Sequence, residues 1–187
     1  TTPIGRDNDI WGVLADFSYD FGGARLNYLG SYRKFARHED LTTIPASGAV
    51  VFPSRADAGY EQNSQELRLS TDIGPLSVQV GGYYFHETGF QYYYIFGLLS
   101  PTPGTVGYTF GFPQNYVLSE SIAGFGQATL KLSDRLRITG GARYSHDEKA
   151  RTGATVICAT TACNGPGDSR SRNDARRTFS KVTWRAG

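Results

Sequence analysis

Methionine is absent from this sequence of 187 residues, and so is any long apolar run. The chain opens on Thr1 and its first residues lack the apolar core of a signal peptide, so we expect a processed or partial product. A helix that spans a membrane needs about 20 consecutive apolar residues, which excludes a helical membrane protein. The abundant residues include 12 Tyr, 11 Phe and 23 Gly, a mixture that favours strands and turns. The composition therefore predicts an all-β chain.

Excess charge of one sign and cysteine are also scarce. The 19 basic and 17 acidic residues leave a net charge of +2, and the positive charge gathers mainly in residues 170–181. This is not the spread basic face of a nucleic-acid-binding protein, so no nucleic-acid partner is expected. The two cysteines, Cys158 and Cys163, lie in a stretch rich in Gly, Thr, Ala and Asn. They predict a small disulfide-closed loop in an oxidising compartment, and two free thiols are the alternative.

Alternation of apolar and polar residues with a period of two predicts seven strands, because every second side chain of a strand faces the same side of a sheet. In the last of them Val182, Trp184 and Ala186 alternate with polar residues until the sequence stops. Glycine blurs the fifth segment and leaves its apolar face open. The expected strands cover residues 9–21, 24–35, 62–71, 76–87, 116–132, 136–145 and 178–187.

The predicted connections alternate between tight turns and long loops. Turns are expected at Gly22-Gly23, at residues 72–75 and around Ser133-Asp134, whereas loops are expected at residues 36–61, 88–115 and 150–177. An antiparallel up-and-down sheet places all the turns on one edge and all the loops on the other. Outer-membrane barrels have this arrangement, with short periplasmic turns and long extracellular loops.

Alternation alone is equally typical of a soluble β-sandwich. Predicted strands of 10 residues or more, segregated loop lengths and aromatic residues near the long-loop edge favour a transmembrane barrel with outer-membrane lipid as a partner. A sheet in lipid must close on itself, so seven strands predict only part of a large barrel. The charged inner faces suit a hydrated or plugged lumen, in which Glu66, Arg68, Arg137 and Arg143 are expected to solvate and cross-link the wall or to contact a plug.

Three blocks of sequence have a distinctive pattern. Residues 119–149 contain Phe-Gly-Gln in one strand, then a leucine-rich strand that ends in Arg-Tyr and an acidic-basic cluster. This block, together with residues 64–87 and 179–187, resembles the barrel of TonB-dependent receptors. The resemblance implies a barrel of about 22 strands around a plug, with import of a scarce nutrient such as an iron-siderophore complex powered through TonB. The plug and the TonB-contacting segment have no match here, so residues 1–187 are expected to be a partial barrel domain.

Each of the three histidines stands beside a carboxylate at the long-loop end of a predicted strand: His38, His86 and His146. One hypothesis is that they face a vestibule and bind a metal chelate or a cationic ligand, and the alternative is a polar rim above the membrane. Tyr92, Tyr93 and Tyr94 belong to an aromatic cluster that forms a ligand-catching surface, continues the strand into the headgroup zone or packs under the loop.

Enzyme signatures are absent from the sequence: it has no phosphate-binding loop, nucleophile elbow or zinc-binding His pair. No catalytic residue, resident metal or cofactor is therefore expected. Two other functions remain open at this point, a passive porin-like channel and a soluble β domain that binds carbohydrate or protein. An upstream plug separates the receptor from the porin, and partition into membranes separates both from the soluble domain.

Overall fold

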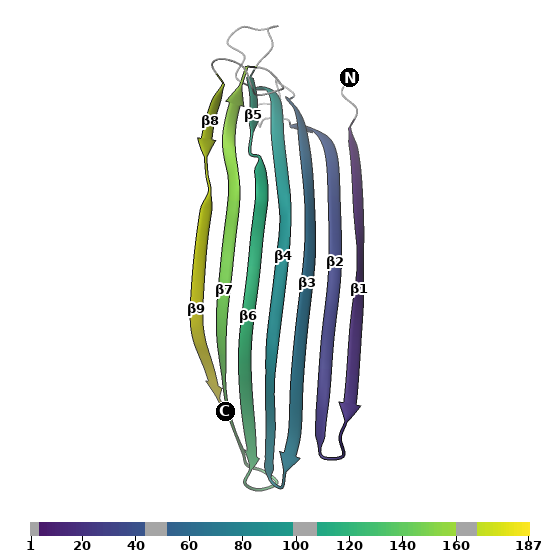
Figure 1. Ribbon diagram of the computed structural model, residues 1–187, viewed down its shortest axis with the longest axis vertical. Coiled ribbons are helices and arrows are strands. Elements are labelled where there is room, and N and C mark those ends of the chain that lie inside the picture. Colours follow the sequence, from purple (N-terminus) through teal and green to yellow (C-terminus); the bar gives the residue numbers. More distant parts are fainter. Residues whose placement is uncertain (1–3, 44–51, 99–107, 160–167) are drawn as a thin grey trace.

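The computed structural model describes residues 4–43, 52–98, 108–159 and 168–187, which form a single antiparallel sheet of nine strands (Figure 1). Among these residues there is no helix that could cross a membrane. The strands are β1 (Gly5–Asp20), β2 (Ala24–Thr43), β3 (Phe52–Ile73), β4 (Leu76–Leu98), β5 (Tyr108–Gly111), β6 (Gln114–Lys131), β7 (Arg137–Cys158), β8 (Ser169–Arg172) and β9 (Ala175–Ala186).

Seven long strands follow one another as an up-and-down meander. Each of them pairs with the next long strand, and the four-residue strands β5 and β8 lie at the upper ends of β6 and β9, where both pair with β7. Asn173 bridges the gap between β8 and β9, since its N–H donates to the Gly153 carbonyl over 3.0 Å. The predicted all-β meander of about seven long strands is confirmed.

The three tight turns lie together at the lower edge in Figure 1, as the sequence predicts. Gly22 and Gly74 have φ angles of 83° and 58°, a left-handed conformation that glycine adopts without a steric penalty. Between β6 and β7 the Leu132 and Ser133 N–H groups donate to the Leu136 carbonyl, at 3.0 and 3.2 Å. These local features fix where each strand reverses.

The predicted extent of the long loops is wrong. Strand structure continues through residues 36–43 and 52–61 and through most of the described parts of 88–115 and 150–177. Four strands reach 20 to 23 residues, about twice the expected length. The upper parts of these strands carry residues of one kind on both faces, mainly polar in residues 36–43 and mainly aromatic in residues 90–96. The period of two that marks a strand is lost there.

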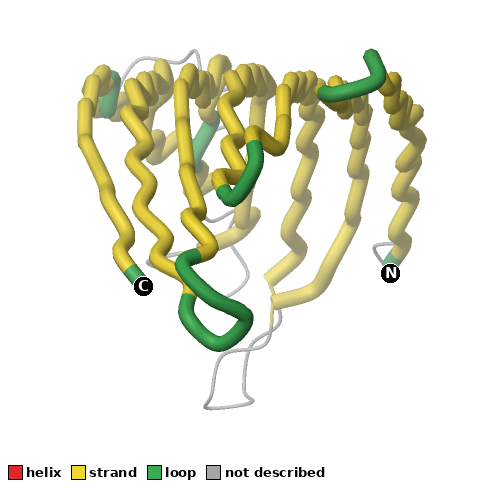
Figure 2. The backbone as a smooth tube through the Cα atoms, turned by 90° about the horizontal axis from the view of Figure 1, so that it is seen from below, coloured by secondary structure: helices red, strands yellow, loops and turns green. Residues whose placement is uncertain are grey.

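The sheet curves into an arch with β1 and β9 at its two free edges (Figure 2). Residues that pair across strands lie on the same face, so the register assigns every side chain to one side of the sheet. One face carries an apolar band along the lower half of the strands. A single cross-strand row shows it: Tyr19, Leu26, Leu69, Val80, Gly126, Ala142 and Trp184.

The opposite face is polar along the same rows. Asp16, Arg68, Gln79, Gln127 and Arg143 all belong to it. Hollows at mid-sheet are lined mainly by residues of this face, as expected on the inside of a curved sheet, so we assign the polar face to the concave side. The register also shows which face of the fifth predicted strand, residues 116–132, is apolar. This strand corresponds to β6, and its apolar face is the convex one.

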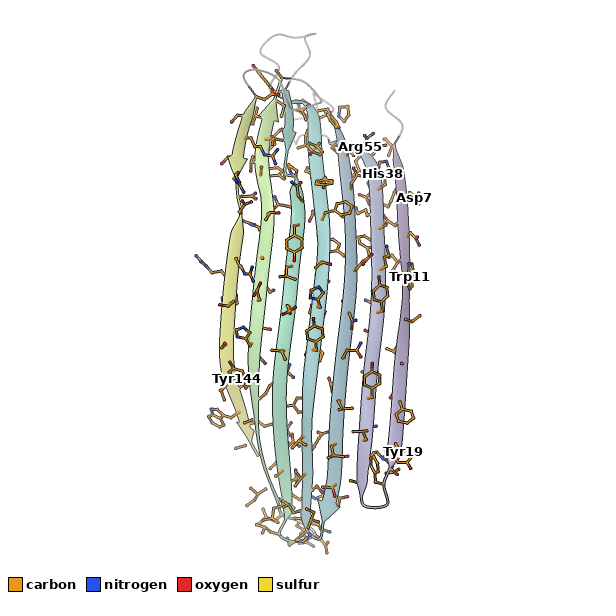
Figure 3. All side chains as sticks on the ribbon, viewed as in Figure 1. Asp7, Trp11, Tyr19, His38, Arg55 and Tyr144 are labelled. Atoms are coloured by element: carbon orange, nitrogen blue, oxygen red, sulfur yellow. The ribbon has the colours of Figure 1, made fainter. Side chains whose placement is uncertain are left out.

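Aromatic residues border the apolar band, as Trp11, Tyr19 and Tyr144 illustrate in Figure 3. At the upper border the rings of Trp11 and Tyr32 lie 5.3 Å apart. From Leu76 to Tyr84 the rise along β4 is about 27 Å, which a strand tilt of about 40° reduces to about 20 Å before the terminal side chains are added. These dimensions are those of the lipid-facing belt of a transmembrane barrel, whose height is about 25 Å.

Val80 and Gln79 test the assignment of the two faces, because they are adjacent in β4 and near the middle of the band. In the complete chain, Val80→Arg should lower the free energy of unfolding by about 2–4 kcal/mol, since it would place a charge in mid-bilayer lipid. The control Gln79→Arg, on the hydrated concave face, should change it by less than about 1 kcal/mol. Urea unfolding from lipid vesicles measures both, and equal effects of the two variants would contradict the assignment.

Candidate functional site on the concave face

A polar cluster occupies the middle of the concave face, where two neighbouring rows cross five strands. The first row contains Arg68, Gly81, Phe125, Arg143 and Thr183, and the second contains Glu66, Tyr83, Ala123, Ser145 and Lys181. They lie around a hollow that is lined by Arg68, Phe125, Arg143 and Arg185, among others. Cations and aromatic rings are thus presented together toward the inside of the arch.

Arg143 is held in place by aromatic rings instead of a carboxylate. Its guanidinium carbon lies 5.6 Å from the centre of the Tyr83 ring and 5.8 Å from that of Phe125, and its Nε donates to Ser145 Oγ over 3.0 Å. A cation over an aromatic face is stabilised by the ring quadrupole while its remaining N–H groups stay available. Arg143 can therefore still donate to an acceptor in the lumen.

Gly81 makes this arrangement possible because Phe125 lies across it. A Cβ at Gly81 would stand 2.4 Å from Phe125 Cζ and 2.7 Å from the Leu67 carbonyl oxygen, closer than real Cβ atoms approach. Sequence reasoning identified Arg68 and Arg143 as lumen residues but missed Gly81, Tyr83 and Phe125. Their relation appears only when the register of three strands is known.

Replacing Gly81 with alanine should displace the Phe125 ring. We expect Gly81→Ala to lower the free energy of unfolding of the complete chain by about 1–3 kcal/mol, as overpacking does. The neighbouring Gly82→Ala is a matched control on the convex face, where the nearest atom to the added Cβ is a carbonyl oxygen at 3.8 Å. Urea unfolding distinguishes them, and a Gly81→Ala chain as stable as Gly82→Ala would refute the close approach.

Ion pairs connect several other charged residues of β1 to β3. On the concave face Arg68 pairs with Glu66, as the sequence predicts for wall residues that cross-link the sheet. Nearer the loop edge the Glu39 side chain is only 2% exposed and pairs with Arg6 at 2.6 Å and with Arg37. The hydrogen bond from Arg37, assisted by Arg6, lowers the pKa of Glu39 and keeps this carboxylate ionised.

The three histidines lie on the convex face, on the same side of the strands as the apolar band. His38 contacts Asp57 at 2.5 Å, His86 contacts Glu120 at 2.9 Å and His146 contacts Ser180 at 2.8 Å. They stand on three different strands, and the described residues contain no group of three or more His, Cys, Asp or Glu side chains that could hold a metal ion. Their role as ligand-binding residues stays a prediction, and their face is that of the polar rim.

The predicted tyrosine cluster is divided between the two faces. Register pairs place Tyr92 with Asp57 and Tyr94 with Arg55 on the convex side, whereas Tyr93 pairs with Ala56 on the concave side. Tyr94 packs against a small buried group that includes Val156 and Cys158. All three tyrosines belong to β4, so the interpretation as a continued strand is correct, and ligand binding stays a prediction.

Cys158 is disulfide-bonded. Cys163, its predicted partner, lies outside the described residues.

His38 lies above the apolar band, where it is accessible to water. Its hydrogen bond with Asp57, with a further contribution from Asp40, raises the pKa of the imidazole above its ordinary value of about 6.5. A raised pKa in the folded state means that the pair stabilises the fold fully below that ordinary value. This contribution is lost as the pH rises through the folded-state pKa.

Titration of the His38 ring by NMR should therefore give a midpoint above that of an unpaired histidine. Asp57→Asn should lower the midpoint, because it removes the acceptor charge that favours the imidazolium. Asp9→Asn, on the same face but opposite Ala36 in the register, serves as the control and should leave the midpoint in place. If Asp57→Asn leaves the titration midpoint of His38 unchanged, this hydrogen bond does not form.

Comparison with known proteins accounts for this two-faced wall. A family model described as TonB dependent receptor-like, beta-barrel matches residues 1–187. This chain belongs to the TonB-dependent receptor β-barrel family. The resemblance inferred from the sequence is thereby confirmed, and the family is one of transport receptors and not of enzymes. A search of curated proteins finds no match to the chain.

Solved structures of receptors share the fold of this TonB-dependent receptor barrel. The ferric yersiniabactin uptake receptor FyuA from Yersinia pestis is 16% identical with a TM-score of 0.63, over 96% of this chain and 25% of that one. The ferric-catecholate import receptor Fiu from E. coli K12 in its closed form is 15% identical with a TM-score of 0.63, over 98% and 30%. The open form of Fiu is 15% identical with a TM-score of 0.61, over 97% of this chain and 33% of that one. The chain thus spans about a quarter to a third of the length of these receptors.

Proposed function

We propose that this chain is a wall segment of an outer-membrane receptor that imports a ferric chelate by TonB-dependent active transport. The structurally similar receptors are a ferric yersiniabactin uptake receptor and a ferric-catecholate import receptor, and for this chain the activity is an inference from fold and family. In this proposal outer-membrane lipid covers the convex band. The segment performs no catalysis, and the ligand is captured from outside.

The observation that carries the proposal is the division of one sheet into an apolar band and a polar, cationic concave face. A soluble sandwich would cover its apolar face with a second sheet, yet among the described residues the convex side chains stay open, with Val182 62% and Trp184 79% exposed. A wide lumen needs the other face hydrated, and Arg68, Gln79 and Arg143 meet that need. Both requirements are those of a large transmembrane barrel.

At the loop edge, Tyr93 is the member of the predicted ligand-binding set whose side of the sheet is the concave one. We include it in the proposed capture surface. The buried Glu39 with its two arginine partners lies in the neighbouring strands on the same face and holds this edge together.

Uptake of radioactive iron by cells that express the complete chain tests the function. Supplied iron(III) chelates should include one tris-catecholate and one tris-hydroxamate, in a strain whose own receptors for both are deleted. We expect uptake of at least one chelate that saturates with concentration and stops when a protonophore collapses the inner-membrane potential. Uptake that is linear in concentration and insensitive to the protonophore would favour the passive channel, and no association with membranes would favour the soluble domain.

A further inference from the structure

A line of cations runs along the concave face of β7 and β9, and this cationic stripe has no equivalent on β1 to β3. The register places Lys149 opposite Arg177, Lys181 opposite Ser145 and Arg185 opposite Gly141. The stripe consists of Arg137, Arg143, Lys149, Arg151, Arg177, Lys181 and Arg185. Asp147 is the one carboxylate on the concave side of these two strands among the described residues, since Glu148 faces the convex side with Arg176.

The cations of the stripe have no carboxylate within ion-pair distance in the part of the chain that the structure describes, whereas those of β1 to β3 are mostly paired. On the concave face Arg25 pairs with Asp20 at 2.9 Å, Arg6 with Glu39 at 2.6 Å and Arg68 with Glu66. Arg143, the best-fixed member of the stripe, uses rings and a hydroxyl instead. Charge is neutralised within one half of the wall and left open in the other.

The stripe is continuous in height. Arg137 lies beside the lower turn, Arg143 follows about 20 Å further along β7, and Lys149 follows about 20 Å beyond Arg143, above the apolar band. A row of like charges on a surface whose other side faces a low-dielectric medium focuses the potential and raises the local concentration of counter-ions. A mobile anion would find a new cation within reach at each step from the loop edge downward.

We propose that the cationic stripe binds and guides an anionic ferric chelate along the lumen wall, from Lys149 and Arg177 near the loop edge to Arg143 at mid-height. The proposal rests on the proposed import function and names the charge class of its substrate. An iron(III) tris-catecholate fits this class, because its doubly charged catecholates outweigh the charge of the metal. Arginine and lysine both attract such oxygen anions, and the planar guanidinium adds directed hydrogen bonds.

The stripe continues above the apolar band, where a solute enters the lumen, and this favours a mobile ligand over a fixed acidic segment of the receptor. A fixed segment would be held equally well by charges at one height. The two occupants predict different results in a binding experiment, because a segment of the receptor would not discriminate between chelates by their charge.

Binding can be measured without transport on the purified complete chain in detergent. A fluorophore on the thiol introduced by Thr183→Cys, opposite Arg143 on the concave face, reports the approach of iron(III) by quenching. The probes are an anionic iron(III) tris-catecholate and a neutral iron(III) tris-hydroxamate. We expect saturable quenching by the anionic probe that weakens steeply with added salt, and little quenching by the neutral one.

The decisive variant is Lys149→Gln/Arg177→Gln, which neutralises a cross-strand pair of the stripe. We expect the dissociation constant of the anionic chelate to rise about 10-fold or more and its salt dependence to flatten. The matched control, Lys34→Gln/Arg176→Gln, removes one lysine and one arginine from the convex face and should change it less than about 2-fold. Heat-modifiable mobility on gels verifies that each variant is folded.

Three outcomes contradict chelate binding by the stripe: unchanged affinity in the decisive variant, equal quenching by both chelates, or no quenching by either. If the decisive variant does not fold and Lys181→Gln alone is also unfolded, the stripe has a structural role, and this result also contradicts the binding proposal. Salt-sensitive binding of the anionic probe, weakened by the decisive variant, supports the stripe even in a chain whose uptake is insensitive to the protonophore. In that case the proposed import function is rejected and chelate binding by the stripe is supported.

Discussion

A sheet that spans a membrane must pair all its backbone groups where it meets lipid, because an unpaired N–H or C=O in hydrocarbon costs several kcal/mol. β4 and β6 accordingly pair without interruption from Leu76 opposite Leu130 to Gly89 opposite Val117. The register shifts of the described sheet fall beyond that stretch, on the loop side, at Gly89/Gln91, Ile95/Leu98 and Gln114/Tyr116. Irregular backbone is thus confined to the part of the wall that water can solvate.

The same constraint decides how much of the fold can be predicted from the sequence. Within the band one face must be apolar and the other hydrated, so alternation is strong and all seven long strands are recognised. Above the band both faces meet water, and a segment such as Arg37-His38-Glu39-Asp40 has no alternation to detect. That part of the sheet is held by contacts between residues 15 to 19 positions apart, Arg55 with Asp40 and His38 with Asp57, which no local pattern contains.

The candidate site shows the same limit in two forms. His38 shares its parity with Leu26, Tyr28 and Tyr32, so extending the predicted second strand past residue 35 would have placed it on the apolar side. The alternation that places His38 is therefore present in the sequence, but the second predicted strand ends at residue 35, before His38. The cluster of Gly81, Phe125 and Arg143 differs, because it depends on the register of β4, β6 and β7, and the sequence contains no measure of that register before the strands are paired.

Charge is compensated differently along the wall, and the energetics explain why this is tolerated. Exposed ion pairs contribute about 0–1 kcal/mol each, so the pairs on β1 to β3 hold side-chain positions more than they stabilise the fold. An unpaired cation on the concave face keeps its hydration and costs little, whereas a cation in the convex band costs about 2–4 kcal/mol at mid-bilayer. The concave face is therefore where the wall can place charge for a purpose other than its own stability. Among the described residues, β7 and β9 place seven cations there with a single carboxylate beside them.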